Sequence, residues 1–133
     1  MILFVCTGNT CRSPLAAALA RAYGVDAQSA GLSAYPGDPA SSQAARVARL
    51  YGADLSGHRA RQVTREMVDQ ADAIFVMTPG HRAALCALFP QAASRARVLE
   101  PSIPDPYGGG EAAYRQCAEN LLEAMKRAGI IRE

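Results

Sequence analysis

The sequence predicts an α/β fold in which one parallel sheet of four strands carries helices on both faces. Three observations lead there. The chain has 133 residues, a length that suits one domain over residues 1–133. Short apolar runs alternate along it with stripes of helical period, the order typical of an α/β layer fold. No internal repeat, low-complexity tract or linker interrupts this order. Right-handed crossovers between parallel strands then place helices on both faces.

The elements are expected in a regular succession. Strands are predicted for four apolar runs, at residues 2–5, 25–30, 73–77 and 97–99. Helices are predicted where apolar residues recur every three or four positions, at residues 13–23, 44–51, 65–70, 81–88 and 114–125. The stripe of the 81–88 helix consists of His81, Ala84, Leu85 and Leu88. Residues suited to ending a helix follow most of them: Gly24, Gly52, Pro90 and Gly129. Ser13 and Thr64 are predicted N-caps, with Pro14 in the first helical position.

Composition excludes several classes of protein. Half of the residues are hydrophobic and 20% are charged, which is typical of a globular chain and not of a disordered one. A net charge of +2 is too small to indicate nucleic-acid binding. Several arginines gather in the middle of the chain, and we interpret them as a solvated face in preference to a substrate-steering patch. They are Arg46, Arg49, Arg59, Arg61 and Arg65.

The cysteines indicate a reducing compartment. There are four, Cys6, Cys11, Cys86 and Cys117. The N-terminus lacks the basic stretch of a signal peptide, and no apolar segment reaches the length of a membrane span. We therefore expect free thiols, a cytoplasmic location, no membrane association and a monomer. No Cys/His spacing resembles a zinc site, so neither a metal nor a cofactor is expected.

The chain's most informative stretch joins the first strand to the first helix. It reads Cys6-Thr7-Gly8-Asn9-Thr10-Cys11-Arg12-Ser13. A loop that ends at a helix N-terminus presents backbone N–H groups, which favour a thiolate and can hold phosphate oxygens. Arg12 adds a planar fork suited to two oxygens at once. The pattern predicts a phosphate-binding loop in which Cys6 attacks phosphorus.

The other loop residues have expected supporting tasks. Gly8 is expected to let backbone N–H groups turn inward without a Cβ clash. Asn9 tolerates a left-handed conformation, and Ser13 can donate its hydroxyl to the Cys6 sulfur.

A thiolate nucleophile also needs an acid for the leaving group, placed at the same edge of the sheet. Ligands of parallel sheets bind beyond the carboxyl ends of the strands, and loop 100–110 follows the fourth strand there. Asp105 lies in that loop between Pro104 and Pro106, which stiffen it. We predict that Asp105 is the general acid.

These motifs together resemble the low-molecular-weight protein phosphatases. The resemblance rests on the 5–14 segment, Ser29-Ala30-Gly31, His58 with the 60–64 segment, and Asp105-Pro106-Tyr107. It implies a four-stranded parallel sheet, with Cys6 as nucleophile, Arg12 as phosphate clamp and Asp105 as general acid. It also implies a hydrogen-bond network that holds the loop, formed by Asn9, Ser13, Ser29 and His58. The reaction would pass through a phosphocysteine that water hydrolyses.

The substrate is expected to be a phosphorylated protein, and Thr10 bears on which residue carries the phosphate. Tyrosine phosphatases of this family commonly have a bulky aliphatic residue there, whereas threonine resembles the bacterial protein-arginine phosphatases. A hydroxyl can meet a guanidinium group, so phosphoarginine is favoured over phosphotyrosine. Tyr35 and Tyr107 are expected to wall the pocket, but aromatic walls suit either substrate.

Other classes remain as alternatives. A thiol-dependent arsenate reductase uses a similar loop, but the partner expected about seven residues before Cys86 falls at Pro79. A sugar-transport phosphocarrier lacks the closing arginine and the loop acid that Arg12 and Asp105 supply here. A non-catalytic anion-binding module is the third. Within the loop, Cys6 and Cys11 form a predicted redox pair, in which Cys11 traps an oxidised Cys6 as a disulfide; simple packing of Cys11 is equally consistent with the sequence.

Overall fold

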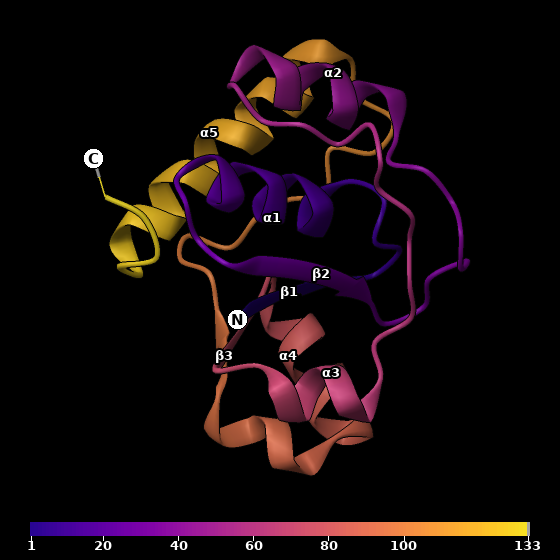
Figure 1. The fold of residues 1–133 in the computed structure, drawn as a ribbon, viewed down its shortest axis with the longest axis vertical. Coiled ribbons are helices and arrows are strands. Elements are labelled where there is room, and N and C mark those ends of the chain that lie inside the picture. The colour runs from indigo at the N-terminus through magenta and orange to yellow at the C-terminus, as the bar shows by residue number, and fades with distance from the viewer. Residues whose placement is uncertain (133) are drawn as a thin grey trace.

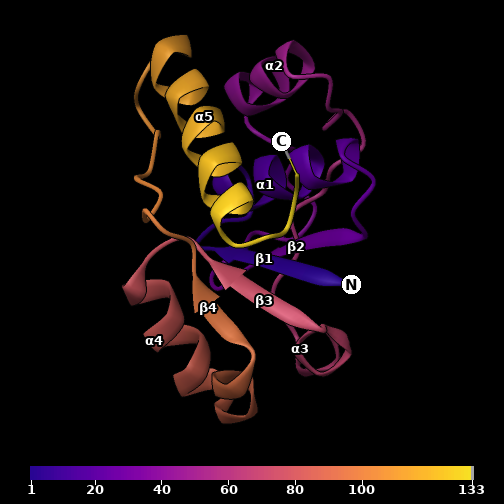
Figure 2. The ribbon, with the colours of Figure 1, turned by 90° about the vertical axis from the view of Figure 1, so that its left-hand side faces the viewer.

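A computed structural model describes residues 1–132 of the chain. Its centre is a four-stranded sheet of β1 (Ile2–Cys6), β2 (Ala27–Gly31), β3 (Ala73–Val76) and β4 (Ala96–Val98). The spatial order is β2-β1-β3-β4, and every neighbouring pair is parallel (Figure 1; Figure 2 labels all four strands). The predicted fold class is therefore confirmed.

Helices cover both faces of the sheet (Figure 2). On one face lie α1 (Arg12–Ala22), α2 (Ser42–Leu50) and α5 (Glu111–Arg127). On the other lie α3 (Arg65–Gln70), α4 (Pro79–Leu88) and the short 3₁₀ helix η1 (Pro90–Ser94). Among residues 1–132, no helix is long and apolar enough to cross a membrane.

The alternation of side chains along β1 divides the core into two layers. Phe4 and Cys6 belong to the cluster formed with α1, α2 and α5, whereas Leu3 and Val5 belong to the cluster formed with α3 and α4. Because successive strand residues point to opposite faces, a slip of one residue would exchange these two sets. The register therefore fixes the side of the sheet on which the Cys6 sulfur lies.

The predicted elements occur at their expected places, with boundaries that differ by a few residues. Thr64 caps α3 as predicted, since its side chain accepts a hydrogen bond from the Met67 N–H at 3.3 Å. The predicted stripe on α4 is narrower than expected: of its four members, His81 and Leu85 are buried, whereas Ala84 and Leu88 are exposed.

The prediction that Ser13 caps α1 is wrong. The first helical residue is Arg12, two positions before Pro14, its N-cap is Cys11, and no side chain caps it. Pro14 is consequently the third residue of the helix and not the first. The physical reason lies in the loop, where the Ser13 hydroxyl has a different set of partners.

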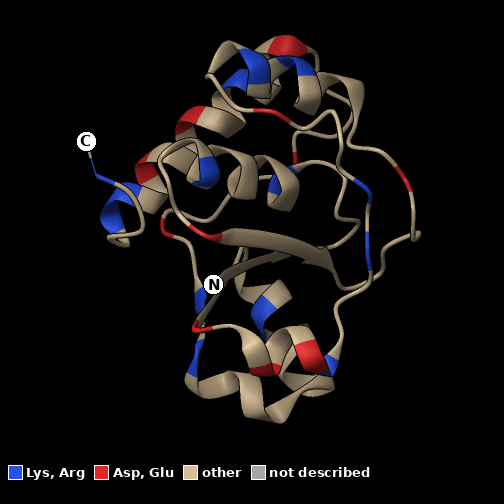
Figure 3. Cartoon of the chain, viewed as in Figure 1, with Lys and Arg blue, Asp and Glu red and all other residues tan. Residues whose placement is uncertain are grey.

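The central arginines do not form one surface patch. Arg46 pairs with Glu111 at 2.7 Å, and Arg65 pairs with Asp69 one turn further along α3 at 3.7 Å. Arg61 donates from Nε to the Ser29 carbonyl at 3.0 Å. Figure 3 shows basic and acidic positions spread over the outer helices and loops. These separate partners agree with the interpretation of a solvated face.

Candidate active site

The loop between β1 and α1 forms the floor of a pocket of about 190 Å³ at the carboxyl end of the sheet. Its lining comes from this loop and from the segment after β4: Cys6, Thr7, Gly8, Thr10, Cys11, Arg12, Asp105 and Tyr107. Cys6 and Arg12 are buried, whereas Asp105 and Tyr107 are exposed. The pocket thus has a thiol and a guanidinium at its floor and a carboxyl group at its mouth.

Ser13 is oriented to serve the Cys6 sulfur. Its Oγ lies 2.9 Å from Cys6 Sγ, and Asn9 Nδ2 donates to the same oxygen at 2.9 Å. The Ser13 hydrogen can go to the sulfur or to the Ala30 carbonyl, which is further away at 3.4 Å. A thiolate is an acceptor only, so Ser13 must donate to it. This is why the hydroxyl is not free to cap α1.

Asn9 anchors the loop through every polar group of its side chain. Its φ of 58° is the left-handed conformation that asparagine tolerates. Asn9 Nδ2 donates to Ser29 Oγ at 2.9 Å, and Asn9 Oδ1 accepts from the Arg61 N–H at 3.0 Å. The side chain is fully buried, so these bonds replace the water it has lost.

His58 completes this set of contacts from the far side of the loop. Its Nε2 donates to the Asn9 carbonyl at 2.7 Å, since a carbonyl oxygen can only accept. Burial lowers the pKa of His58, and the hydrogen bond to Asn9 opposes that shift. The structure therefore brings together the four residues expected to hold the loop.

The close approach expected at Gly8 occurs instead at Gly31. A Cβ at Gly8 would lie 3.7 Å from Thr10 Oγ1, an ordinary contact, and Gly8 does not have a positive φ. A Cβ at Gly31 would lie only 2.7 Å from the Thr7 carbonyl oxygen. The end of β2 must therefore lack a side chain for the Cys6 loop to pack against it. The steric expectation for Gly8 is wrong.

Arg12 connects the loop to the segment that carries Asp105. Its Nη1 donates to the Ile103 carbonyl at 3.1 Å, and its Nη2 lies 3.9 Å from Asp105 Oδ2. Asp105 Oδ1 accepts from the Tyr107 N–H at 3.1 Å, which leaves Oδ2 on the side of the guanidinium. The predicted acid and the predicted clamp thus face each other across the pocket.

Of the two predicted aromatic walls, one reaches the pocket. Tyr107 lines it and is 82% exposed, so most of its ring is available for contact. Tyr35 is 79% exposed and is not among the lining residues. The structure does not bring Tyr35 to the pocket, because the loop that carries it packs through its backbone. Gly37 N–H, for example, donates to the Ala60 carbonyl at 2.8 Å.

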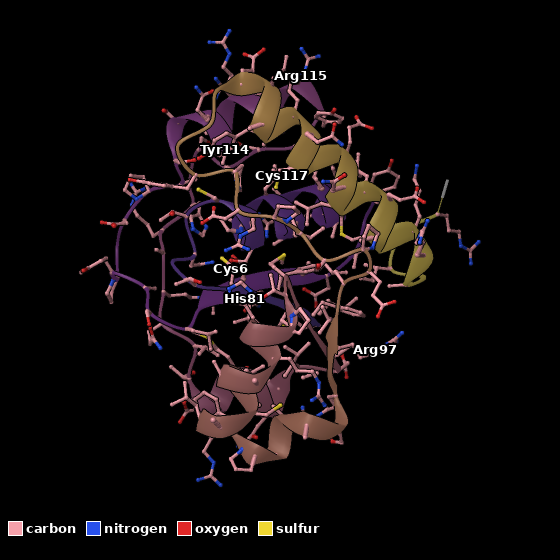
Figure 4. All side chains as sticks on the ribbon, turned by 180° about the vertical axis from the view of Figure 1, so that it is seen from behind. Cys6, His81, Arg97, Tyr114, Arg115 and Cys117 are labelled. Atoms are coloured by element: carbon pink, nitrogen blue, oxygen red, sulfur yellow. The ribbon has the colours of Figure 1, made fainter. Side chains whose placement is uncertain are left out.

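Cys11 lies in the loop and its sulfur points toward α2 and α5. Its Sγ lies 3.5 Å from Ser41 Oγ and 3.5 Å from the Tyr114 hydroxyl. Burial, together with the Cys11 contact, raises the pKa of Tyr114 to about 12. Burial likewise raises the pKa of Cys117 on α5 to about 12, which keeps that thiol protonated and unreactive. All four cysteines are free (Figure 4 labels Cys6 and Cys117).

His81 is a pocket neighbour that the sequence interpretation missed. Thr78 caps α4 and accepts from the His81 N–H at 3.2 Å, which places His81 in the first turn at the carboxyl end of β3. Its Nε2 lies 2.9 Å from Oγ1 of Thr7, the residue that follows Cys6 (Figure 4 labels Cys6 and His81). In the sequence, His81 is one member of the stripe that predicts the 81–88 helix. The missed signal was its position directly after a parallel strand, at the edge where Cys6 lies.

No group of three or more His, Cys, Asp or Glu side chains in residues 1–132 is placed to hold a metal ion. The pocket offers other chemistry. A buried thiol, a buried guanidinium cation and a carboxyl group line one pocket, and together they could carry out phosphoryl transfer.

Comparisons with known proteins agree with this geometry. A family model described as "Low molecular weight phosphotyrosine protein phosphatase" matches residues 1–128. Protein-arginine-phosphatase of Geobacillus stearothermophilus is 39% identical over 136 residues, covering 95% of this chain and 91% of that protein. Low molecular weight protein-tyrosine-phosphatase Etp of Escherichia coli (strain K12) is 38% identical over 134 residues, covering 96% and 88%. The solved structure of YwlE arginine phosphatase from Geobacillus stearothermophilus superposes with a TM-score of 0.88 at 38% identity, covering 96% of this chain and 88% of that one.

Proposed function

This chain belongs to the low molecular weight phosphotyrosine protein phosphatase family, and from that membership we propose that it hydrolyses phosphoarginine in proteins through a phosphocysteine intermediate. The observation that carries the proposal is the convergence of Cys6, Arg12 and Asp105 on one pocket, with the Thr10 hydroxyl in its lining.

In the first step the Cys6 thiolate attacks phosphorus opposite the leaving nitrogen. The Ser13 hydroxyl, 2.9 Å from Cys6 Sγ, stabilises the thiolate before attack. Arg12 and the loop N–H groups hold the phosphoryl oxygens as charge develops on them. Asp105 protonates the bridging nitrogen, the P–N bond breaks with its electron pair going to that nitrogen, and arginine leaves with an ordinary guanidinium group. The products of this step are phosphocysteine and the Asp105 carboxylate.

In the second step water replaces arginine. The Asp105 carboxylate takes a proton from the attacking water, and the oxygen bonds to phosphorus as the S–P bond breaks. Cys6 leaves as the thiolate, which Ser13 again stabilises, and inorganic phosphate is released. Asp105 ends protonated, as the next cycle requires. Every proton and electron pair is accounted for by these residues and water.

Thr10 supports phosphoarginine as the substrate. It lines the pocket, so its hydroxyl can accept a hydrogen bond from a guanidinium N–H that an aliphatic side chain could not accept. The name of the Geobacillus stearothermophilus relative, a protein-arginine-phosphatase, agrees with this assignment. The alternative substrate is phosphotyrosine, which the name of the Escherichia coli relative favours, together with the exposed ring of Tyr107 at the pocket mouth.

Two variants test the proposal. Thr10→Ile should lower the ratio of phosphoarginine to phosphotyrosine hydrolysis, because it replaces a hydroxyl in the pocket lining by an aliphatic group. Cys6→Ser should abolish phosphate release from both substrates while leaving vanadate binding partly intact, since the cradle remains. Residual Cys6→Ser activity within tenfold of the wild type would exclude Cys6 as the nucleophile. A wild type that prefers phosphotyrosine would overturn the substrate assignment.

A further inference from the structure

Thr7 and His81 form a polar pair at the mouth of the pocket that the mechanism above does not use. Thr7 Oγ1 lies 2.9 Å from His81 Nε2, although the two residues are 74 positions apart in the chain. Thr7 is the exposed member of the phosphate-binding loop, whereas Cys6, Asn9, Arg12 and Ser13 are buried. It lines the pocket together with Asp105 and Tyr107, the two residues at the mouth. Thr7 therefore lies on the leaving-group side and not at the phosphate floor.

His81 is buried in a setting that favours its neutral ring. Its side chain is 9% exposed, and its Nδ1 is buried without a hydrogen-bond partner among residues 1–132. Burial lowers the pKa of His81, the Arg12 cation lowers it further, and Asp105 opposes both. A neutral ring also adds no positive charge beside a cationic substrate.

The contact with His81 leaves Thr7 able to accept. If Nε2–H donates to Thr7, one lone pair of Oγ1 stays free; if the Thr7 hydroxyl donates to Nε2, both lone pairs stay free. In either tautomer Thr7 presents an acceptor to the pocket mouth. A guanidinium group offers N–H donors there, whereas the ring of phosphotyrosine offers no strong donor.

We propose that Thr7 is a specificity-determining residue whose hydroxyl oxygen accepts a hydrogen bond from the guanidinium of phosphoarginine, and that His81 is its positioning residue. The inference rests on the proposed function and deepens it. Thr7 would contact the guanidinium at the mouth of the pocket, and this contact is separate from that of the Thr10 hydroxyl. Thr7 discriminates between substrates because the bond exists with one of them and not with the other.

The experiment measures kcat and KM on a phosphoarginine protein and on the same protein carrying phosphotyrosine. Thr7→Val and His81→Leu should each lower kcat/KM for phosphoarginine about tenfold, the scale of one hydrogen bond to a charged group. Both should lower kcat/KM for phosphotyrosine by a smaller factor, because that substrate offers no N–H donor to Thr7. Thr7→Ser and His81→Gln keep the hydroxyl and the N–H donor and should restore the phosphoarginine rate. The Thr7→Val/His81→Leu double variant should lose no more than Thr7→Val alone.

Thr64→Val provides the matched control. It removes a threonine hydroxyl that accepts from a backbone N–H at the start of α3, outside the pocket lining. It should change neither substrate's kcat/KM. An equal loss on both substrates for Thr7→Val or His81→Leu would show a structural role and overturn the inference. So would a Thr7→Val enzyme with unchanged phosphoarginine kinetics.

The same data separate the two proposals. A wild type that hydrolyses phosphotyrosine and not phosphoarginine would overturn the proposed function. A wild type that prefers phosphoarginine, combined with a Thr7→Val variant of unchanged preference, would overturn the role of Thr7 and leave the proposed function standing.

Discussion

The Ser13 hydroxyl contacts the Cys6 sulfur and does not cap helix α1. Ser13 is a favourable residue for capping, yet α1 begins at Arg12 without any side-chain cap. A lost cap costs about 1 kcal/mol. The hydroxyl instead lies between Asn9 Nδ2 and Cys6 Sγ, each at 2.9 Å. A charge-assisted bond to a thiolate is worth more than a neutral cap, so the exchange favours the site.

Replacement of Asp105 tests its role as the acid. Asp105→Asn keeps the shape of the side chain and removes the proton, so we expect the chemical step to slow by roughly a hundredfold or more. The loss should shrink for substrates whose leaving groups need no proton, such as p-nitrophenyl phosphate. Single-turnover rates on good and poor leaving groups measure this difference. An equal loss across the whole series would contradict the acid role.

The loop thiol at position 11 gives a second prediction at this scale. Peroxide should convert Cys6 to a sulfenic acid, and Cys11 should trap it as a disulfide that a thiol reductant reverses. Its present partners, Ser41 Oγ and the Tyr114 hydroxyl at 3.5 Å, are weak enough to release it. A Cys11→Ala enzyme should lose activity irreversibly under the same treatment. Equal recovery of the wild type and the variant after reduction would show that Cys11 only packs.

At the scale of the elements, periodicity was sufficient to predict the sheet and its helices. Strand β3 and helix α5 carry strong apolar patterns, and both occur where the sequence predicts them. The sequence pattern predicted which loops share an edge of the sheet, but it did not predict which side chains of distant segments touch there. His81 meets Thr7, and Gly31 meets the Thr7 carbonyl, only because parallel strands end at one edge of the sheet. Tyr35 was misplaced for another reason, since the position of its loop depends on backbone hydrogen bonds to another loop, such as the one from Gly37 N–H to the Ala60 carbonyl.

The approach of β2 to the Cys6 loop can be tested at Gly31. The Cβ of Gly31→Ala would lie 2.7 Å from the Thr7 carbonyl oxygen, so the loop or the strand must shift. We expect a loss of about 1–3 kcal/mol in the free energy of unfolding, together with reduced activity. Gly57→Ala is the control, because its Cβ would meet no atom within 4 Å. Urea titrations of both variants measure the difference; equal stability would contradict the tight packing.

At the scale of the whole molecule, the sheet separates two cores and carries the pocket at its carboxyl edge. The layer with α1, α2 and α5 buries Cys6, while the layer with α3 and α4 supplies His81. The pocket therefore depends on both layers being folded. The Asp105 carboxyl group belongs to the segment after β4, and Arg12 binds this segment by donating to the Ile103 carbonyl at 3.1 Å. Loss of either layer would separate the catalytic groups.

Global stability should depend on pH through the two histidines. Burial lowers the pKa of both His58 and His81 below the ordinary value of 6.5. The unfolded chain therefore binds protons more readily than the folded one in this range. The stabilisation is fully present above pH 6.5 and is lost as the pH falls from there through the folded-state pKa values.

The free energy of unfolding, measured by urea titration between about pH 7.5 and pH 5, should accordingly decrease with pH in the wild type. His58→Gln keeps an N–H donor for the Asn9 carbonyl and removes one titrating group, so its decrease should be smaller. A wild type whose stability is flat or rises toward pH 5 would contradict the burial of these side chains as neutral groups.

The preference between phosphoarginine and phosphotyrosine tests the central claim most directly. The measurement is kcat/KM of the wild-type enzyme on one protein substrate that carries either phosphoarginine or phosphotyrosine, with released phosphate as the readout. A pocket with Thr10 and Thr7 hydroxyls in its lining predicts the larger kcat/KM on phosphoarginine. A larger kcat/KM on phosphotyrosine would contradict the account.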